Sequence, residues 1–144
     1  MILPDLNILL YAYDADSPFH EGAKLWLEEL LSGSETVALS WHTIVGFLRI
    51  GTNPRVFKVP LTIAEAIEIV EEWLACPSVK ITLPTTRHWE ILQDMLITGQ
   101  AAGNLISDAH LAALAIENGA FLATTDKDFA RFGNRLKTVN PLIK

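Results

Sequence analysis

The chain has 144 residues, half of them hydrophobic, which excludes a disordered protein and fits one globular domain spanning residues 1–144. Its formal net charge of −6 at pH 7 argues against a protein that binds nucleic acid through a broad basic surface. The single cysteine excludes an internal disulfide framework and favours a reducing, cytoplasmic setting. The N-terminal segment lacks a basic start and contains Asp5, so we expect neither a signal peptide nor a membrane span.

The first half of the chain alternates short apolar strands with helices. Strands are expected at residues 1–3, before Pro4, and 36–39. Helices are expected at residues 7–13, from the Ser17-Pro18 pair onward, and at residues 41–50. A capping box of Thr62 and Glu65 then opens a further helix. Its pattern predicts an inward face made of Ile63, Ala66, Ile67, Val70 and Leu74.

The second half continues the alternation. A third strand is expected at residues 79–83, followed by a helix at residues 86–98. Asn104 or Ser107 can cap the next helix, and Gly119 suits the left-handed residue that ends it. A strand at residues 120–124, a helical turn at 129–132 and an edge strand at 136–139 complete the chain. Strands separated by helices predict an α/β fold with a mainly parallel sheet covered on both faces.

Three carboxylates fall at the ends of these elements. Asp5 follows the first strand, Asp126 follows the fourth strand, and Asp108 lies in the first turn of the helix between residues 104 and 118. Right-handed crossovers place the carboxyl ends of parallel strands on one rim, so these side chains are expected to converge there. Clustered carboxylates repel one another unless a cation lies between them, and Mg²⁺ or Mn²⁺ prefers such oxygen ligands.

Each acid also has a structural interpretation. Asp5 could cap the following helix, and Asp108 could interact with the helix dipole. Asp126 and Asp128 could be turn residues. The four histidines show no ligand spacing, and the four tryptophans are expected to pack against the core.

Basic residues occur in two groups. Arg49, Arg55 and Lys58 surround one loop, and a second group that begins with Lys127 follows the last acids. These side chains could hold RNA phosphates beside the rim, or they could form an ordinary solvated surface.

The ordered set of motifs resembles a known family. It comprises Pro4-Asp5-Leu6-Asn7, the segment from Ser40 to Val56, the segment from Asn104 to Ala113, and Thr125-Asp126-Lys127-Asp128-Phe129. In this order the segments resemble PIN-domain ribonucleases, and most of all the VapC-type toxins of bacterial toxin–antitoxin pairs.

The resemblance implies a three-layer α/β/α fold and cleavage of RNA, tRNA among the candidates, that depends on Mg²⁺ or Mn²⁺. It implies a VapB-like antitoxin as partner and a homodimer. Asp5, Asp108 and Asp126 would be the catalytic, metal-binding carboxylates, with Asp128 as a fourth metal ligand. Asn7 or Thr125 would orient the ligands, and Arg49, Arg55 and Lys127 are the candidate RNA-binding residues.

One position departs from the family pattern. Many members carry a glutamate in the helix after the second strand, where this chain has Gly46. This leaves a second hypothesis, a catalytically weakened PIN-like protein that binds RNA or an antitoxin without efficient turnover. A phosphatase with an aspartate nucleophile is disfavoured, because Asp5-Leu6-Asn7 lacks a second aspartate.

Overall fold

The computed structural model of the chain describes residues 1–143. Its centre is an all-parallel sheet of five strands in the order β3-β2-β1-β4-β5. The strands are β1 (Ile2–Pro4), β2 (Val37–Leu39), β3 (Val79–Ile81), β4 (Phe121–Ala123) and β5 (Thr138–Val139). The predicted fold class is therefore confirmed.

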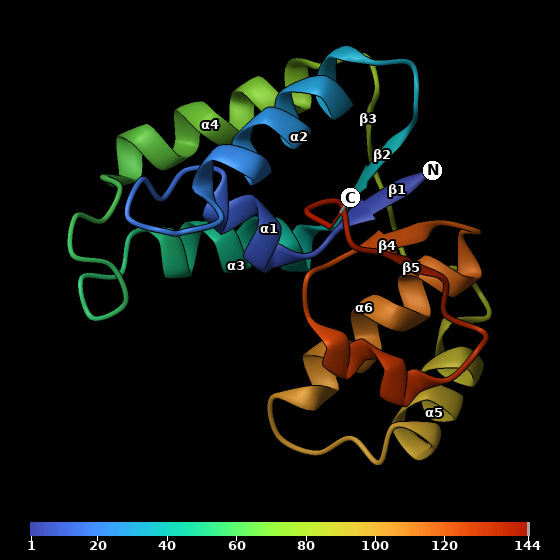
Figure 1. The fold of residues 1–144 in the computed structure, drawn as a ribbon. Helices are drawn as coiled ribbons and strands as arrows, with labels where there is room; N and C mark the ends of the chain where they lie inside the picture. Colours follow the sequence, from blue (N-terminus) through green and yellow to red (C-terminus); the bar gives the residue numbers. More distant parts are fainter. Residues whose placement is uncertain (144) are drawn as a thin grey trace.

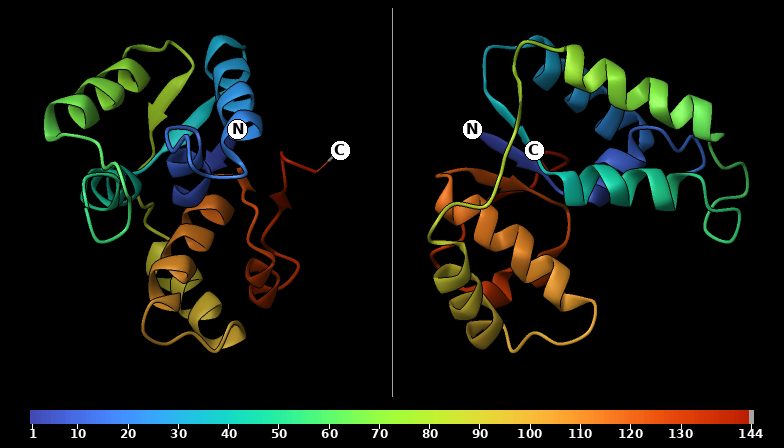
Figure 2. Two further views of the ribbon diagram at one scale, coloured as in Figure 1. Left: turned by 60° about the vertical axis from the view of Figure 1, so that its left-hand side comes forward. Right: turned by 180° about the vertical axis from the view of Figure 1, so that it is seen from behind.

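Helices cover both faces of this sheet, as Figures 1 and 2 show. One side carries α1 (Leu6–Tyr11), α2 (His20–Ser32), α3 (Trp41–Gly51) and α4 (Ile63–Ala75). The other side carries α5 (His88–Thr98), α6 (Leu105–Glu117) and the 3₁₀ helix η1 (Lys127–Phe132). Each side has its own cluster of buried hydrophobic residues.

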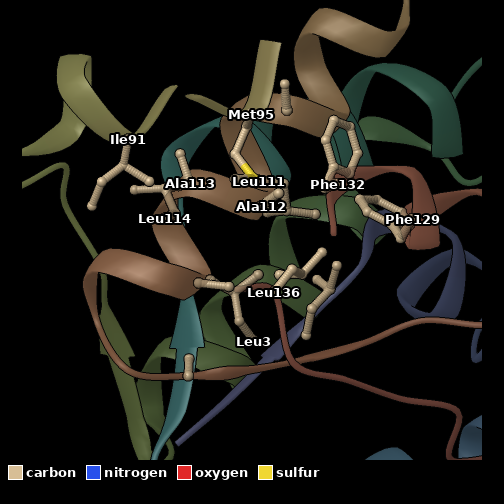
Figure 3. Packing of buried hydrophobic residues seen from close by; sticks show 14 of the residues in the cluster. Leu3, Ile91, Met95, Leu111, Ala112, Ala113, Leu114, Phe129, Phe132 and Leu136 are labelled. Atoms are coloured by element: carbon tan, nitrogen blue, oxygen red, sulfur yellow. The ribbon is translucent and has the colours of Figure 1, made fainter. Parts of the chain in front are cut away.

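Helix α6 is the most deeply packed helix on its side of the sheet. Residues 111–115 are all buried, and three of them are alanines whose small side chains let neighbouring elements approach. Figure 3 shows Leu114 and Leu111 among Ile91, Met95 and Phe132 of α5 and η1. The helix ends as predicted, because Gly119 adopts the left-handed φ of 67° that favours glycine.

Several predicted boundaries and faces differ from the structure. Helix α2 begins at His20, because Ser17 Oγ accepts a hydrogen bond from the backbone N of Phe19 and holds a turn before the helix. Asn104 occupies the cap position of α6 without a side-chain cap hydrogen bond. The capping box of α4 is confirmed, whereas its inward face is formed by Ala66, Val70 and Trp73. Three residues that were expected to point inward are exposed: Ile63, Ile67 and Leu74.

Within residues 1–143, no helix combines the length and apolar character that crossing a membrane requires.

Candidate active site

The site begins where β1 and β4 end side by side. In their parallel register Pro4 is paired with Ala123, and the backbone N of Asp5 donates to the carbonyl oxygen of Ala123 at 2.9 Å. The next residues, Asp5 and Thr124, are consequently neighbours, and both are buried. Thr124 Oγ1 donates a hydrogen bond to Asp5 Oδ2 at 2.9 Å. Asp5 occupies the cap position of α1, but its side chain makes no cap hydrogen bond of regular geometry.

Thr124 also connects Asp5 to the next acid. Its Oγ1 accepts a hydrogen bond from the backbone N of Asp126 at 3.0 Å, so one hydroxyl joins the ends of two strands. The sequence reasoning missed this residue and selected Thr125, which is half-buried and makes neither of these bonds. The available signal was the continuous buried run of a parallel strand, which Thr124 extends to the rim.

Asp108 completes the group from the first turn of α6. Burial, followed by the charges of Asp5, Asp126 and Asp128, raises the pKa of Asp108 from 3.8 to about 6, while Arg131 acts in the opposite direction. Burial also raises the pKa of Asp5, and the charge of Asp126 adds to this effect. The hydrogen bond from Thr124 and the backbone N–H groups at the start of α1 oppose it. The three predicted acids therefore share one electrostatic neighbourhood.

Asp128 has a different environment. Arg131 donates to both of its carboxylate oxygens, from Nε at 3.1 Å and from Nη2 at 3.0 Å. The Nη1 atom of Arg131 donates to the carbonyl oxygen of Gly99 at 2.8 Å, which ties η1 to the end of α5. The backbone N of Asp128 donates to Asp126 Oδ1 at 2.9 Å. Asp128 is thus paired with a cation of the protein itself.

The donor set fits a hydrated magnesium ion. Within the described residues 1–143, no three His, Cys, Asp or Glu side chains are arranged to hold a metal ion directly. Mg²⁺ commonly keeps several waters and binds through only one or two carboxylates. Asp5, Asp108 and Asp126 offer oxygen ligands, and burial together with the neighbouring acids, which raise the pKa of Asp108, penalises a charged form that a cation would stabilise.

Gly46 lies buried in α3 beneath Leu6 of α1. A Cβ atom at this position would lie 2.9 Å from Leu6 Cδ2, which is closer than real contacts of this kind. Glycine therefore permits the close approach of these two helices, and a larger side chain requires Leu6 to rotate away. Ser40 Oγ caps α3 at the backbone N of Thr43 beside this contact.

A hydrogen-bonded series of side chains, Glu117, His88 and His110, connects α6 with α5. Glu117, whose side chain is 1% exposed, accepts from the backbone N of Thr85 and lies 2.6 Å from His88 Nδ1. His88 Nε2 lies 3.0 Å from His110 Nδ1, and the ring of His42 packs edge-on against His110. Burial and the nearby histidines lower the pKa of His110. His88 lies 29 residues from Glu117 and 22 residues from His110, so no local spacing in the sequence indicates these contacts.

The candidate RNA-binding residues fall into two places. Lys127 follows Asp126 directly, and both residues line two adjacent clefts in the protein surface. Arg49 lies in the last turn of α3, and Arg55 lies in the following loop, at the end of α3 that points away from the sheet (Figures 1 and 2). Asn7 is exposed in the first turn of α1 and borders a cleft that includes Asp126.

Comparison with known families matches residues 2–134 to the PIN domain. The chain belongs to the PIN-domain family. It is 42% identical over 132 residues to ribonuclease VapC37 of Mycobacterium tuberculosis, covering 92% of each chain. It is 40% identical over 142 residues to ribonuclease VapC33 of the same organism, covering 99% of each.

Solved structures share the PIN fold at lower identity. VapBC2 of Rickettsia felis, bound to a DNA fragment from its promoter, matches with a TM-score of 0.67 at 20% identity, covering 97% of this chain and 98% of that one. Mycobacterium tuberculosis VapC20, described as a toxin that cleaves the sarcin–ricin loop, matches with a TM-score of 0.68 at 18% identity. That match covers 92% of this chain and 95% of VapC20.

Proposed function

We propose that this PIN domain is a metal-dependent endoribonuclease and the toxin component of a VapBC-type pair. The observation that carries the proposal is the electrostatic coupling of Asp108, in the first turn of α6, with Asp5 and Asp126, which follow β1 and β4; burial and these neighbouring charges raise the pKa of Asp108. Its relatives named as VapC ribonucleases support the same activity.

The residues of the chain supply binding and orientation. Asp5, Asp108 and Asp126 would hold Mg²⁺ or Mn²⁺, and Thr124 keeps Asp5 and the backbone of Asp126 in a fixed relation. When bound, such an ion activates water for attack on a phosphodiester and stabilises the developing negative charge. Lys127, beside Asp126, would attract the phosphates of the RNA.

Incubation of the purified protein with tRNAs and other RNAs tests this activity. We expect cleavage in Mg²⁺ or Mn²⁺, none in EDTA, and near-complete loss in Asp5→Asn, which keeps the shape of the side chain but removes its charge. The variant Asp16→Asn makes the same change at an exposed turn and should cleave normally. Equal cleavage by Asp5→Asn and the unmodified protein would contradict the mechanism.

A second candidate, a PIN domain that binds its partner with little turnover, is favoured by one observation. The position of the family's additional acid is occupied by Gly46, and Leu6 fills the space above it. Under this candidate the protein would bind an antitoxin tightly while its cleavage rate stayed unchanged between the unmodified protein and Asp5→Asn.

The partners that we propose are a VapB-like antitoxin and a second copy of the chain. Side chains on the outer surfaces of α3 and α4 are apolar and exposed: Trp41, Val45, Ile63 and Ile67. Phe47 and Trp73 of the same two helices are fully buried in the core and do not belong to this surface. Light scattering of the protein alone, and with the product of a neighbouring antitoxin-like reading frame, measures both associations.

A further inference from the structure

A cleft of about 490 Å³ adjoins the acidic site. It lies where α1, the loop before α2, the residues after β4 and the C-terminal segment meet. Its walls include Asn7, Tyr11, Phe19, Asp126, Lys127 and Asn140. Because Asp126 belongs to both, the cleft is continuous with the acidic site, and its volume falls within the range of small-molecule sites, about 300–1,000 Å³.

An aromatic pair forms part of this cleft. The rings of Tyr11 and Phe19 lie with their centroids 5.0 Å apart and their planes at 38°. Phe19 nevertheless keeps 46% of its surface exposed, although it has an aromatic neighbour to pack against. His20 Nδ1 lies 2.9 Å from the carbonyl oxygen of Tyr11, and this contact fixes the segment that carries Phe19 to the end of α1. A supported, exposed ring of this kind is a surface on which a nucleobase stacks.

Polar groups complete the chemistry of a nucleotide site. The exposed Asn7 offers an amide that both donates and accepts, as the edge of a base requires. Lys127 lies next to Asp126 in this cleft, and its ammonium group would attract the phosphate of the nucleotide. Asn140 Oδ1 accepts from the backbone N of Leu142 at 3.0 Å, which orders the C-terminal wall of the cleft.

A neighbouring cleft provides an internal comparison. It has a volume of about 290 Å³ and shares Asp126, Lys127 and Asn140 with the first cleft. Its aromatic residue, Phe129, is only 3% exposed and packs into the core. Of these two clefts, the one that contains Phe19 is therefore the one that offers an exposed aromatic ring.

We propose that the Phe19 cleft binds the base of an unpaired nucleotide next to the phosphodiester that the acids act on. This inference rests on the proposed nuclease function, because a phosphodiester brought to the ion that Asp5, Asp108 and Asp126 would bind places its nucleoside at the border of the cleft. A base stacked inside a continuous duplex cannot reach Phe19.

The chain supplies a matched control for this residue. Phe121 is 45% exposed, almost the same as Phe19, but it is the first residue of β4 and lies at the amino ends of the parallel strands, whereas Asp5 and Asp126 follow their carboxyl ends. Cleavage of a mixed-sequence, single-stranded RNA oligomer carrying a fluorophore and a quencher is measured for Phe19→Leu and Phe121→Leu. We expect Phe19→Leu to raise KM by about 5-fold to 150-fold, the range for one stacked base, with little change in kcat. Phe121→Leu should leave both constants unchanged.

Two further variants keep the test independent of folding. Phe19→Trp retains an aromatic face and should keep the wild-type KM, while Asn7→Ala changes an exposed side chain and should raise it. Circular dichroism confirms that each variant is folded. Equal KM values for Phe19→Leu and Phe121→Leu would overturn the base site and leave the nuclease proposal standing.

Failure of the nuclease proposal would have a different signature. If the unmodified protein cleaves no RNA, fluorescence anisotropy with the same oligomer in EDTA still tests the cleft. Weaker binding by Phe19→Leu, but not by Phe121→Leu, would support the base site, and equal affinities would overturn it. Loss of antitoxin binding by Phe19→Leu with unchanged RNA affinity would also overturn it, because the cleft would then be a protein interface.

Discussion

Replacing Asp108 with asparagine should make the protein more stable while removing its proposed activity. The folded state raises the pKa of Asp108 from 3.8 to about 6, mainly through burial and then through the charges of Asp5 and Asp126. At 1.36 kcal/mol per pKa unit this rise corresponds to about 3 kcal/mol. The side chain is only half-buried, so solvent screening reduces the expected gain to about 1 kcal/mol.

The sign of this effect depends on pH. A carboxyl group with a raised pKa in the folded state contributes stability below pH 3.8, its ordinary pKa, and loses that contribution as the pH rises through about 6. The advantage of Asp108→Asn should therefore be complete near pH 8 and should shrink as the pH falls toward 4. Mg²⁺ should stabilise the unmodified protein more than the variant, because the ion relieves the same repulsion.

Urea unfolding in EDTA, near pH 8 and near pH 5, measures this difference. With a typical denaturant slope of about 1–3 kcal/mol per molar urea, the midpoint of Asp108→Asn should rise by roughly 0.3–1 M at the higher pH. The exposed Asp16→Asn controls for the change in net charge and should leave the midpoint nearly unchanged. A variant that is no more stable than the parent near pH 8 would refute the idea that burial and the neighbouring acids penalise the charge of Asp108.

Two other predictions concern Gly46 and Glu117. Gly46→Glu should lower the Mg²⁺ concentration that half-saturates cleavage, provided that Leu6 rotates away, whereas Gly46→Gln matches its size without the charge. Equal titrations for the two variants would show that Gly46 serves packing alone. Glu117→Leu should lower the free energy of unfolding by about 2 kcal/mol, because the backbone N of Thr85 and the ring of His88 lose their buried acceptor. Thermal unfolding checks this, and an unchanged midpoint would contradict it.

The sequence predicted the fold class and the convergence of the acids for a physical reason. Apolar strands separated by helices permit mainly parallel pairing, and parallel strands bring their carboxyl ends to one rim. Asp5 and Asp126 follow strands, so their approximate place depends only on topology. The electrostatic coupling of Asp108 with both residues agrees with that expectation.

The neighbours of the acids could not be predicted in the same way. Contact between Thr124 and Asp5 requires β4 to lie beside β1 in a register that pairs Ala123 with Pro4, and local patterns do not encode strand order. The prediction of the inward face of α4 was wrong for a related reason. Ile63 and Trp73 are both apolar, and tertiary packing alone decides that Trp73 is buried while Ile63 is exposed.

The hydrogen bonds that connect Glu117, His88 and His110 all run in one direction, from donor to acceptor. A carboxylate can only accept, so Glu117 requires His88 to carry its proton on Nδ1, which leaves Nε2 of a neutral ring as an acceptor. That acceptor in turn requires His110 to place its proton on Nδ1. The lowered pKa of His110 favours the neutral ring, whose Nε2 then carries a lone pair. Through the neutral ring of His88 on α5, one buried carboxylate of α6 thus sets the tautomer of His110, to which it makes no hydrogen bond of its own.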